Sequence, residues 1–364
     1  MTVESDRVDA LLDELGITGG PLLAVARPLL LLAVQLGASD EETLTVSRAG
    51  RLGPFLTDLA VRPKEGETLT LDEYVARSDM DPALVREVWT AFGLPTSGVV
   101  PPRVTPDAGQ AIEVVVFMSE FLGRHASLAL ARVIGAATAS IADTLANSTR
   151  IGAEVPNLES GRSYDDVTTE MTDVAQQLLP TFWEAVGAIF RRHLVLVSYG
   201  SWAPDEATAV TTTRAVGFVD LVGSTEVLRS QSVAELAASV DAFERLVWER
   251  VTGAGGRVVK LIGDEAMFVV DRASAACDIA RALVDSSPQA VRVGLAYGDI
   301  VALHGDCYGP TVNLAARLVA IADAGTVLVS EEVVQRIAGL TADAIDVGPL
   351  RGFPEVTRAF VLSR

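Results

Sequence analysis

The chain changes its pattern of apolar residues once, near Arg214, and this change constrains the fold more than any other feature of the sequence. Before it, apolar residues recur at helical spacing. After it, short runs rich in β-branched residues alternate with helical segments. A length of 364 residues is enough for about two domains. We therefore expect an α+β chain with a helical domain at residues 1–200, a linker at 201–213 and a second domain at 214–364.

The first domain is predicted to be all-helical. Thr70 followed by Glu73 is a capping-box signature, and Asp81 followed by Pro82 is typical of a helix start. Gly123 and Gly135 are candidate breaks in a long apolar stretch. The segments with helical spacing are 3–15, 22–36, 47–59, 70–77, 81–89, 108–147 and 167–193, with a polar loop at 157–164.

The second domain is predicted to begin with the order βαββαβ, which is the ferredoxin-like arrangement, with its helices packed on one face of an antiparallel sheet. The expected strands are 214–220, 257–262, 266–271, 291–297, 299–304 and 326–330, followed by a hairpin that closes on 357–362. The expected helices are 232–252, 273–286 and 311–321.

Composition excludes several classes of function. The net charge of −19 argues against duplex nucleic acid as a partner, since phosphates need clustered Lys and Arg. Two cysteines are too few for a disulfide framework and fit a reducing cytoplasm. The acidic N-terminus does not resemble an export signal. The longest apolar run, 22–36, is shorter than the roughly 20 residues that span a bilayer, so we expect a cytoplasmic protein without a membrane span.

Two aspartates stand at the ends of predicted strands. Asp264 follows Gly263 at the tip of a hairpin, with Lys260 just before the turn, and Asp220 ends the first strand before a Gly-Ser-Thr helix start. Magnesium takes one or two protein carboxylates together with phosphate oxygens and water. Two acids at neighbouring strand ends therefore favour a pair of divalent cations that bind a triphosphate.

A third stretch carries an amide and a guanidinium on one helix. Gly309-Pro310 marks a turn, and the helix that follows places Asn313 and Arg317 one turn apart on the same face. A guanidinium beside an amide can bind an anion and a sugar.

These three motifs, together with Asp306, resemble the class III nucleotidyl cyclases over residues 214–364. The resemblance implies that Asp220 and Asp264 hold two Mg²⁺ or Mn²⁺ ions across the triphosphate. It implies that Asn313 positions the ribose and that Arg317 stabilises charge on the α-phosphate. A further cation usually holds the terminal phosphates in this family, and Arg292 and Arg358 are the candidates.

The same resemblance assigns Lys260 and Asp306 to the purine base. A lysine donor suits adenine N1 and an aspartate acceptor suits the exocyclic amine, whereas guanine requires the reverse polarity. The expected activity is therefore that of an adenylate cyclase, which converts ATP to cyclic AMP. In this family, two catalytic domains arranged head to tail share each active site. All six positions are present in this chain, so a homodimer with two equivalent sites is expected.

The first domain is similar, more loosely, to the helical regulatory module of some actinobacterial cyclases, which restrains the catalytic half and can respond to pH. Histidine titrates near neutral pH, so His193, beside Arg191 and Arg192, and His125 are candidate sensors. The alternative is that they are solvated helix residues. The apolar run 22–36 is either a buried helix or a site for a fatty acyl chain.

Three other functions stay open at this stage. The catalytic fold can serve as a silent nucleotide-binding or dimerising module. The helix pair at 70–92 can be a DNA-binding unit or a helical packing unit. The cyclic-dinucleotide synthases share a related fold and a similar acidic turn, but the spacing of Asp306, Asn313 and Arg317 favours cyclisation of one nucleotide.

Overall fold

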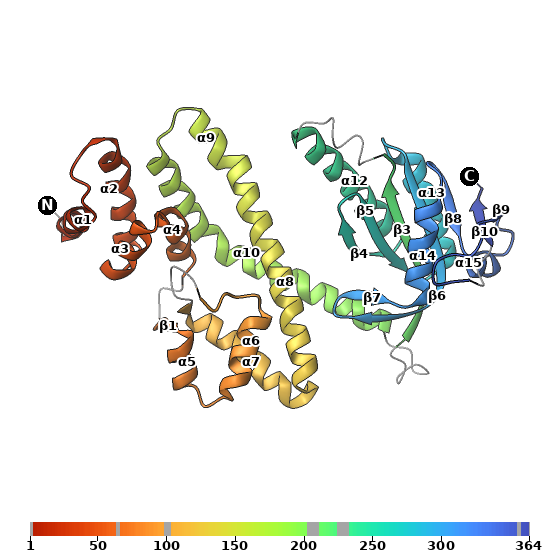
Figure 1. The fold of residues 1–364 in the computed structure, drawn as a ribbon, viewed down its shortest axis with the longest axis horizontal. Helices are drawn as coiled ribbons and strands as arrows, with labels where there is room; N and C mark the ends of the chain where they lie inside the picture. The colour runs from red at the N-terminus through yellow and green to blue at the C-terminus, as the bar shows by residue number, and fades with distance from the viewer. Residues whose placement is uncertain are drawn as a thin grey trace. The chain divides into compact units, whose positions relative to one another are not determined.

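The computed structural model describes residues 3–62, 66–97, 103–201, 211–223, 233–354 and 358–363. It divides into two compact units, Met1–Trp202 and Ala203–Arg364 (Figure 1). The linker predicted at 201–213 falls largely on 202–210, which lie outside the described residues.

The first unit is helical, apart from one pair of two-residue strands. Its helices are α1 (Val3–Glu14), α2 (Gly20–Gln35), α3 (Asp40–Arg48), α4 (Leu52–Val61), α5 (Leu71–Arg77), α6 (Pro82–Ala91), α7 (Pro106–Leu122), α8 (Arg124–Thr149), the π-helix η1 (Arg150–Glu154), α9 (Val155–Glu159) and α10 (Tyr164–Ser201). Strands β1 (Leu69–Thr70) and β2 (Arg103–Val104) pair antiparallel.

The predicted helix caps are confirmed. The Glu73 backbone N–H donates to Thr70 Oγ1 at 3.2 Å, and the Thr70 N–H donates to Glu73 Oε2 at 2.8 Å. The Ala83 N–H donates to Asp81 Oδ1 at 3.0 Å. The apolar sides of α5 and α6 belong to one core with α7 and α8. The helix pair is therefore built into a packed core of its unit, as the packing alternative predicted.

Several predicted helix boundaries are wrong. The segment 47–59 is two helices, because the chain turns at Gly50, whose φ of 66° is accessible chiefly to glycine. The candidate break at Gly123, with φ of 79°, separates α7 from α8, whereas Gly135 lies inside α8 and does not interrupt it. Part of the expected loop at 157–164 belongs to α9, and α10 continues to Ser201 rather than ending at His193.

One helical stretch of the described residues, Arg124–Glu159, is long and apolar enough by composition to span a membrane, and 17% of its most apolar window is buried. Core helices of soluble proteins pass the same test. The run at 22–36 lies in α2, whose buried residues pack in two apolar clusters of the first unit, so its apolar character is explained by packing.

The second unit has a mixed sheet with the strand order β4-β5-β3-β6-β8-β10-β9. Its elements are β3 (Thr211–Leu221), α12 (Val233–Gly253), β4 (Arg257–Ile262), β5 (Glu265–Val270), α13 (Ala273–Ser286), β6 (Val291–Leu303), β7 (Asp306–Tyr308), α14 (Pro310–Ile321), β8 (Val327–Val329), α15 (Glu331–Arg336), β9 (Ala342–Asp346) and β10 (Arg358–Leu362). The predicted βαββαβ order is confirmed.

The two helices of the βαββαβ unit, α12 and α13, lie on one face of the sheet as expected, and α14, which follows that unit, covers the opposite face. Alternate residues of β3 enter two different cores. Ala215 and Val219 pack with α12, α13 and α15, whereas Val216 and Phe218 pack with α14. Because side chains alternate along a strand, Asp220 lies on the same face as Val216 and Phe218. The face covered by α14 is therefore the one that carries Asp220.

The predicted strands 291–297 and 299–304 are one continuous strand, β6, which pairs with β3 from Val291 to Val301. Strand β7 and helix α15 were not predicted. The end of β6 returns through His304 and Gly305, whose φ angles of 53° and 79° are typical of a two-residue type I′ hairpin. Strands β9 and β10 form the closing antiparallel pair.

Candidate active site

The hairpin between β4 and β5 brings Asp264 to the end of β3. Gly263, with φ of 65°, forms the turn, and the Leu221 N–H donates to the Asp264 carbonyl at 3.1 Å. This bond holds the hairpin tip against the residue that follows Asp220. The two aspartates predicted to bind metal therefore lie at neighbouring positions in the fold.

Three charged side chains form a row across the sheet at this end. In the strand register, Asp220 lies opposite Glu265 on β5 and opposite Arg292 on β6. Arg292 donates to Asp220 Oδ2 through Nε at 2.7 Å, and its Nη2 lies 2.6 Å from the same oxygen. The Asp220 side chain is only 13% exposed, so its carboxylate is largely desolvated.

Burial raises the pKa of Glu265, and the charges of Asp220 and Asp264 raise it further, although Arg292 and Lys260 oppose the shift. Three carboxylates at one strand end thus repel one another. A repelled set of acids, partly neutralised by a guanidinium, is a site that a cation would stabilise.

Among the residues that the structure describes, no group of three or more His, Cys, Asp or Glu side chains has the arrangement of a metal site. Asp220 and Asp264 can therefore supply only part of a coordination shell. This fits magnesium or manganese, which retain waters and take the remaining oxygens from a polyphosphate. The two residues fit the predicted role.

Lys260 and Asp306 form an ion pair of 2.6 Å between Nζ and Oδ2. A β-bulge between Val258 and Lys260 places Lys260 opposite Met267, on the face that α14 covers. The hairpin between β6 and β7 places Asp306 at the start of β7. The structure thus joins two side chains that are 46 residues apart in the chain.

Burial pushes the pKa of Asp306 upward, but the hydrogen bonds from Lys260 and from the Cys307 N–H outweigh it, and the pKa lies below its usual range. The Cys307 N–H donates to Oδ1 at 2.7 Å. Asp306 is therefore ionised at neutral pH and acts as an acceptor only.

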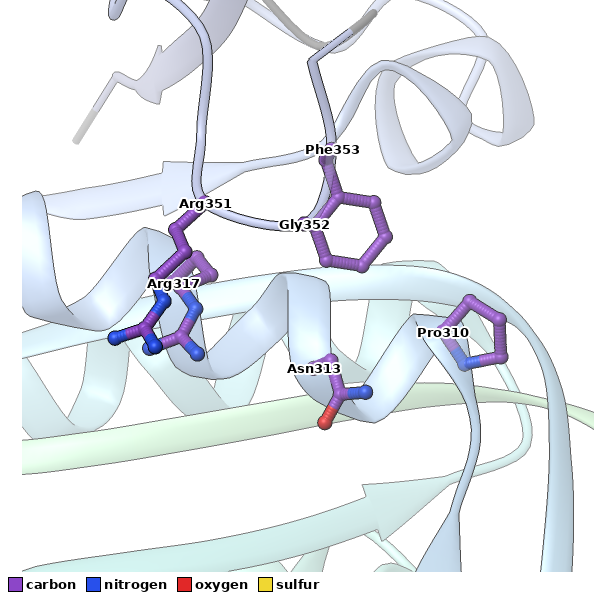
Figure 2. Close-up of a pocket in the computed structure, with 6 residues that line it drawn as sticks. All are labelled: Pro310, Asn313, Arg317, Arg351, Gly352 and Phe353. Atoms are coloured by element: carbon purple, nitrogen blue, oxygen red, sulfur yellow. The ribbon is translucent and has the colours of Figure 1, made fainter.

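Asn313 and Arg317 line a pocket of about 370 Å³ on the outer side of α14 (Figure 2). Both are exposed, whereas Thr311, Val312, Leu314, Ala315, Leu318 and Val319 are buried. The loop above the helix adds Arg351, Gly352 and Phe353, and Pro310 closes the pocket. Figure 2 shows the guanidinium groups of Arg317 and Arg351 at the same end of the pocket, with Asn313 projecting from the next turn.

Arg351 was missed in the sequence. Its signal was the Arg-Gly-Phe-Pro turn between the last two strands, which only the fold brings over α14. Of the two cations considered for the terminal phosphates, Arg292 pairs with Asp220 and Arg358 is exposed on β10. Two guanidinium groups in one pocket can bind an anion.

His125 and His193, the candidate sensors, are both exposed in the first unit, on α8 and α10. Neither belongs to the site of the second unit.

Comparison with known proteins identifies the second unit. Residues 210–362 match the adenylate and guanylate cyclase catalytic domain. An uncharacterized protein of Mycobacterium tuberculosis is 30% identical over 336 residues, which cover 90% of this chain and 88% of that protein. An adenylate cyclase of Streptomyces coelicolor is 37% identical over 215 residues, 57% of this chain and 55% of that enzyme. The crystal structure of an adenylyl cyclase from P. aeruginosa, 18% identical, covers 42% of this chain and 96% of that one with a TM-score of 0.38.

Proposed function

Because this chain belongs to the class III nucleotidyl cyclase family, we propose that it is an adenylate cyclase that converts ATP to 3′,5′-cyclic AMP and diphosphate. The ion pair between Lys260 and Asp306 is the observation that carries the choice of ATP. Lys260 can donate to adenine N1, while the ionised Asp306 accepts from the exocyclic amine. Guanine would present an oxygen to the aspartate and an N–H to the lysine, and both contacts would be repulsive.

The pocket on α14 supports the ribose and phosphate roles. The Asn313 amide can hold the ribose, and Arg317 can stabilise the charge that develops on the α-phosphate. Arg351 shares this pocket, so we assign it to the terminal phosphates in place of the two cations proposed from the sequence.

Asp220 and Asp264 would hold the two divalent cations, Mg²⁺ or Mn²⁺. Bound there, the cations would lower the pKa of the ribose 3′-hydroxyl and offset phosphate charge. The protein's own contribution is to hold the two aspartates close together through the hydrogen bond from the Leu221 N–H to the Asp264 backbone carbonyl.

We propose that the active site forms between two copies of the chain. Asn313 and Arg317 are exposed on the side of α14 that faces away from its own sheet, while Asp220 lies on that sheet. One nucleotide can therefore contact Asn313 and Arg317 of one copy and Asp220 of the other most simply in a head-to-tail homodimer. Such a dimer has two equivalent sites.

Mixed variants test this arrangement. D264N and R317A should each be inactive alone. Mixed in equal amounts, they should recover about a quarter of the wild-type activity, since half of the dimers contain one intact site of two. A mixture of D264N and D220N must show no recovery. Both substitutions alter the metal-binding aspartates, so every site in every dimer has one altered aspartate.

The first unit is proposed to regulate the second. The M. tuberculosis relative aligns along 90% of the chain, so this unit is shared with a protein that also has the catalytic region. Protonation of His193, beside Arg191 and Arg192 on the helix that ends at Ser201, is one proposed trigger, and His125 is the other. His193→Asn and His125→Asn should alter the activity-against-pH curve of the full chain, and an unchanged curve would remove that residue from the proposal.

The first experiment is cyclic AMP production from ATP with Mn²⁺, with GTP as the competing substrate. It compares the full chain with residues 203–364 at several pH values. An active fragment and a weaker full chain at neutral pH would support a restraining first unit. If neither makes a cyclic nucleotide from ATP or GTP, the alternative of a silent nucleotide-binding and dimerising module replaces this proposal.

A further inference from the structure

Among the described residues, Arg292 is the ion-pair partner of Asp220, and two of its nitrogens lie against a single carboxylate oxygen. Its third nitrogen, Nη1, donates to the Ala320 carbonyl at 3.2 Å, in the last turn of α14. Arg292 therefore joins the acid assigned to metal binding with the helix that carries Asn313 and Arg317.

The position of this guanidinium conflicts with a bound cation. Nε and Nη2 lie 2.7 and 2.6 Å from Asp220 Oδ2, at direct hydrogen-bond distance. A divalent ion on the same oxygen would lie within a few ångströms of a positive charge in a largely desolvated site. At such a separation like charges repel strongly. The two cations therefore compete for Asp220 Oδ2.

The surrounding charges explain why an arginine is needed there. Asp220, Asp264 and Glu265 converge at the strand ends, and the pKa of Glu265 is raised by burial and by both aspartates. Without a counter-ion, the largely buried carboxylate of Asp220 would lie opposite a second acid, Glu265, in the strand register. Arg292, held in the adjacent strand by its register with Asp220, supplies that counter-ion.

We propose that Arg292 is a resident counter-ion that occupies Asp220 in the metal-free enzyme and is displaced when a divalent cation binds. This inference rests on the proposed metal role of Asp220. Displacement also weakens the link that Arg292 forms between Asp220 and the last turn of α14. Metal binding at Asp220 therefore changes the contacts of the helix that carries Asn313 and Arg317.

The test measures Mn²⁺ binding to the full chain without nucleotide, from the electron paramagnetic resonance signal of free Mn²⁺. Arg292→Gln removes the competitor and should bind Mn²⁺ about tenfold more tightly, as expected for loss of a charge at this distance. Arg214→Gln is the matched control. It also removes an arginine paired with a carboxylate, Asp271 at 3.0 Å, from the same sheet, but at the other end of β3. Its Mn²⁺ affinity should equal that of the wild type.

D220N and D264N separate this inference from the proposed function. If both bind Mn²⁺ as the wild type does, the metal site itself is wrong. If both bind at least tenfold more weakly while Arg292→Gln matches the wild type, the metal site stands and the counter-ion role is overturned.

A measurement on the unaltered protein covers the case in which Arg292→Gln fails to fold. The Nε–H resonance of Arg292, assigned by its loss in Arg292→Lys, should shift when Mg²⁺ is added without nucleotide. A resonance that stays in place while Mg²⁺ binds would show that the guanidinium is not displaced.

Discussion

Lys260 and Asp306 are bonded to each other at 2.6 Å, and this contact sets the polarity of the base site before any nucleotide arrives. Lys260 stays a donor and Asp306, whose pKa is held below its usual range against the effect of burial, stays an acceptor. The ammonium group has further hydrogens to donate, and the carboxylate has further lone pairs to accept.

Reversing this polarity should change the preferred base. In the double variant Lys260→Glu/Asp306→Ser, the glutamate can accept from guanine N1–H and the serine can donate to the guanine oxygen. We expect kcat/KM for ATP to fall by at least about a hundredfold while that for GTP rises. Cyclic AMP and cyclic GTP formation measured side by side checks this. A variant that keeps its preference for ATP would show that this pair does not contact the base.

The two arginines of the α14 pocket should differ in their effects. Arg317→Ala should lower kcat about a hundredfold or more, because it removes a charge needed at the transition state. Arg351→Ala should mainly raise KM for ATP, by about tenfold, because it removes a phosphate contact made equally in both states. Steady-state kinetics with ATP separates them. Arg250→Ala, on α12 at the other face of the sheet, is the control for lost positive charge and should change neither constant.

Glu265 should make the metal-free protein less stable at neutral pH. Its folded pKa lies above the unfolded value, so the folded state favours the protonated form. The raised pKa stabilises the folded protein relative to the unfolded chain. This stabilisation is fully present below the unfolded-state pKa of Glu265 and is lost as the pH rises through its folded-state pKa. Glu265→Gln should therefore increase the free energy of unfolding by about 1 kcal/mol at pH 7. Denaturant titration with a chelator present checks this.

The gain from Glu265→Gln should shrink toward zero as the pH falls below the ordinary carboxyl range, where Glu265 is protonated in both states. Added Mn²⁺ should also reduce it, since a cation neutralises the same repulsion. A gain of equal size at low and neutral pH would mean that charge is not its cause.

Gly294 lets α14 lie close to β6. A Cβ atom there would meet the Val319 nitrogen at 2.3 Å and the Ala315 carbonyl oxygen at 2.5 Å, both in the helix backbone. Gly294→Ala should therefore displace the helix and cost about 2–3 kcal/mol of stability. Because the helix carries Asn313 and Arg317, activity should fall more than binding of Mn²⁺. Gly253→Ala, with no atom within 4 Å of the added Cβ, is the control and should be neutral in both measurements.

Local chemistry was sufficient to predict much of this protein. The caps at Thr70 and Asp81, the hairpin turn at Gly263 and the βαββαβ order follow from residues close together in the chain, and the structure has all of them. The motif residues Asp220, Asp264, Lys260, Asp306, Asn313 and Arg317 were also chosen from the sequence, because together they resemble the motifs of the class III nucleotidyl cyclases.

Tertiary structure decided which of these side chains meet. A period of two residues shows that a strand has two faces, but not that α14 covers the face of Asp220 while the other helices cover the opposite one. The pairing of Arg292 with Asp220 depends on strand register, and the placement of Arg351 over α14 depends on how the last loop folds back. Both contacts join residues far apart in the chain, and only the packed sheet fixes those distances.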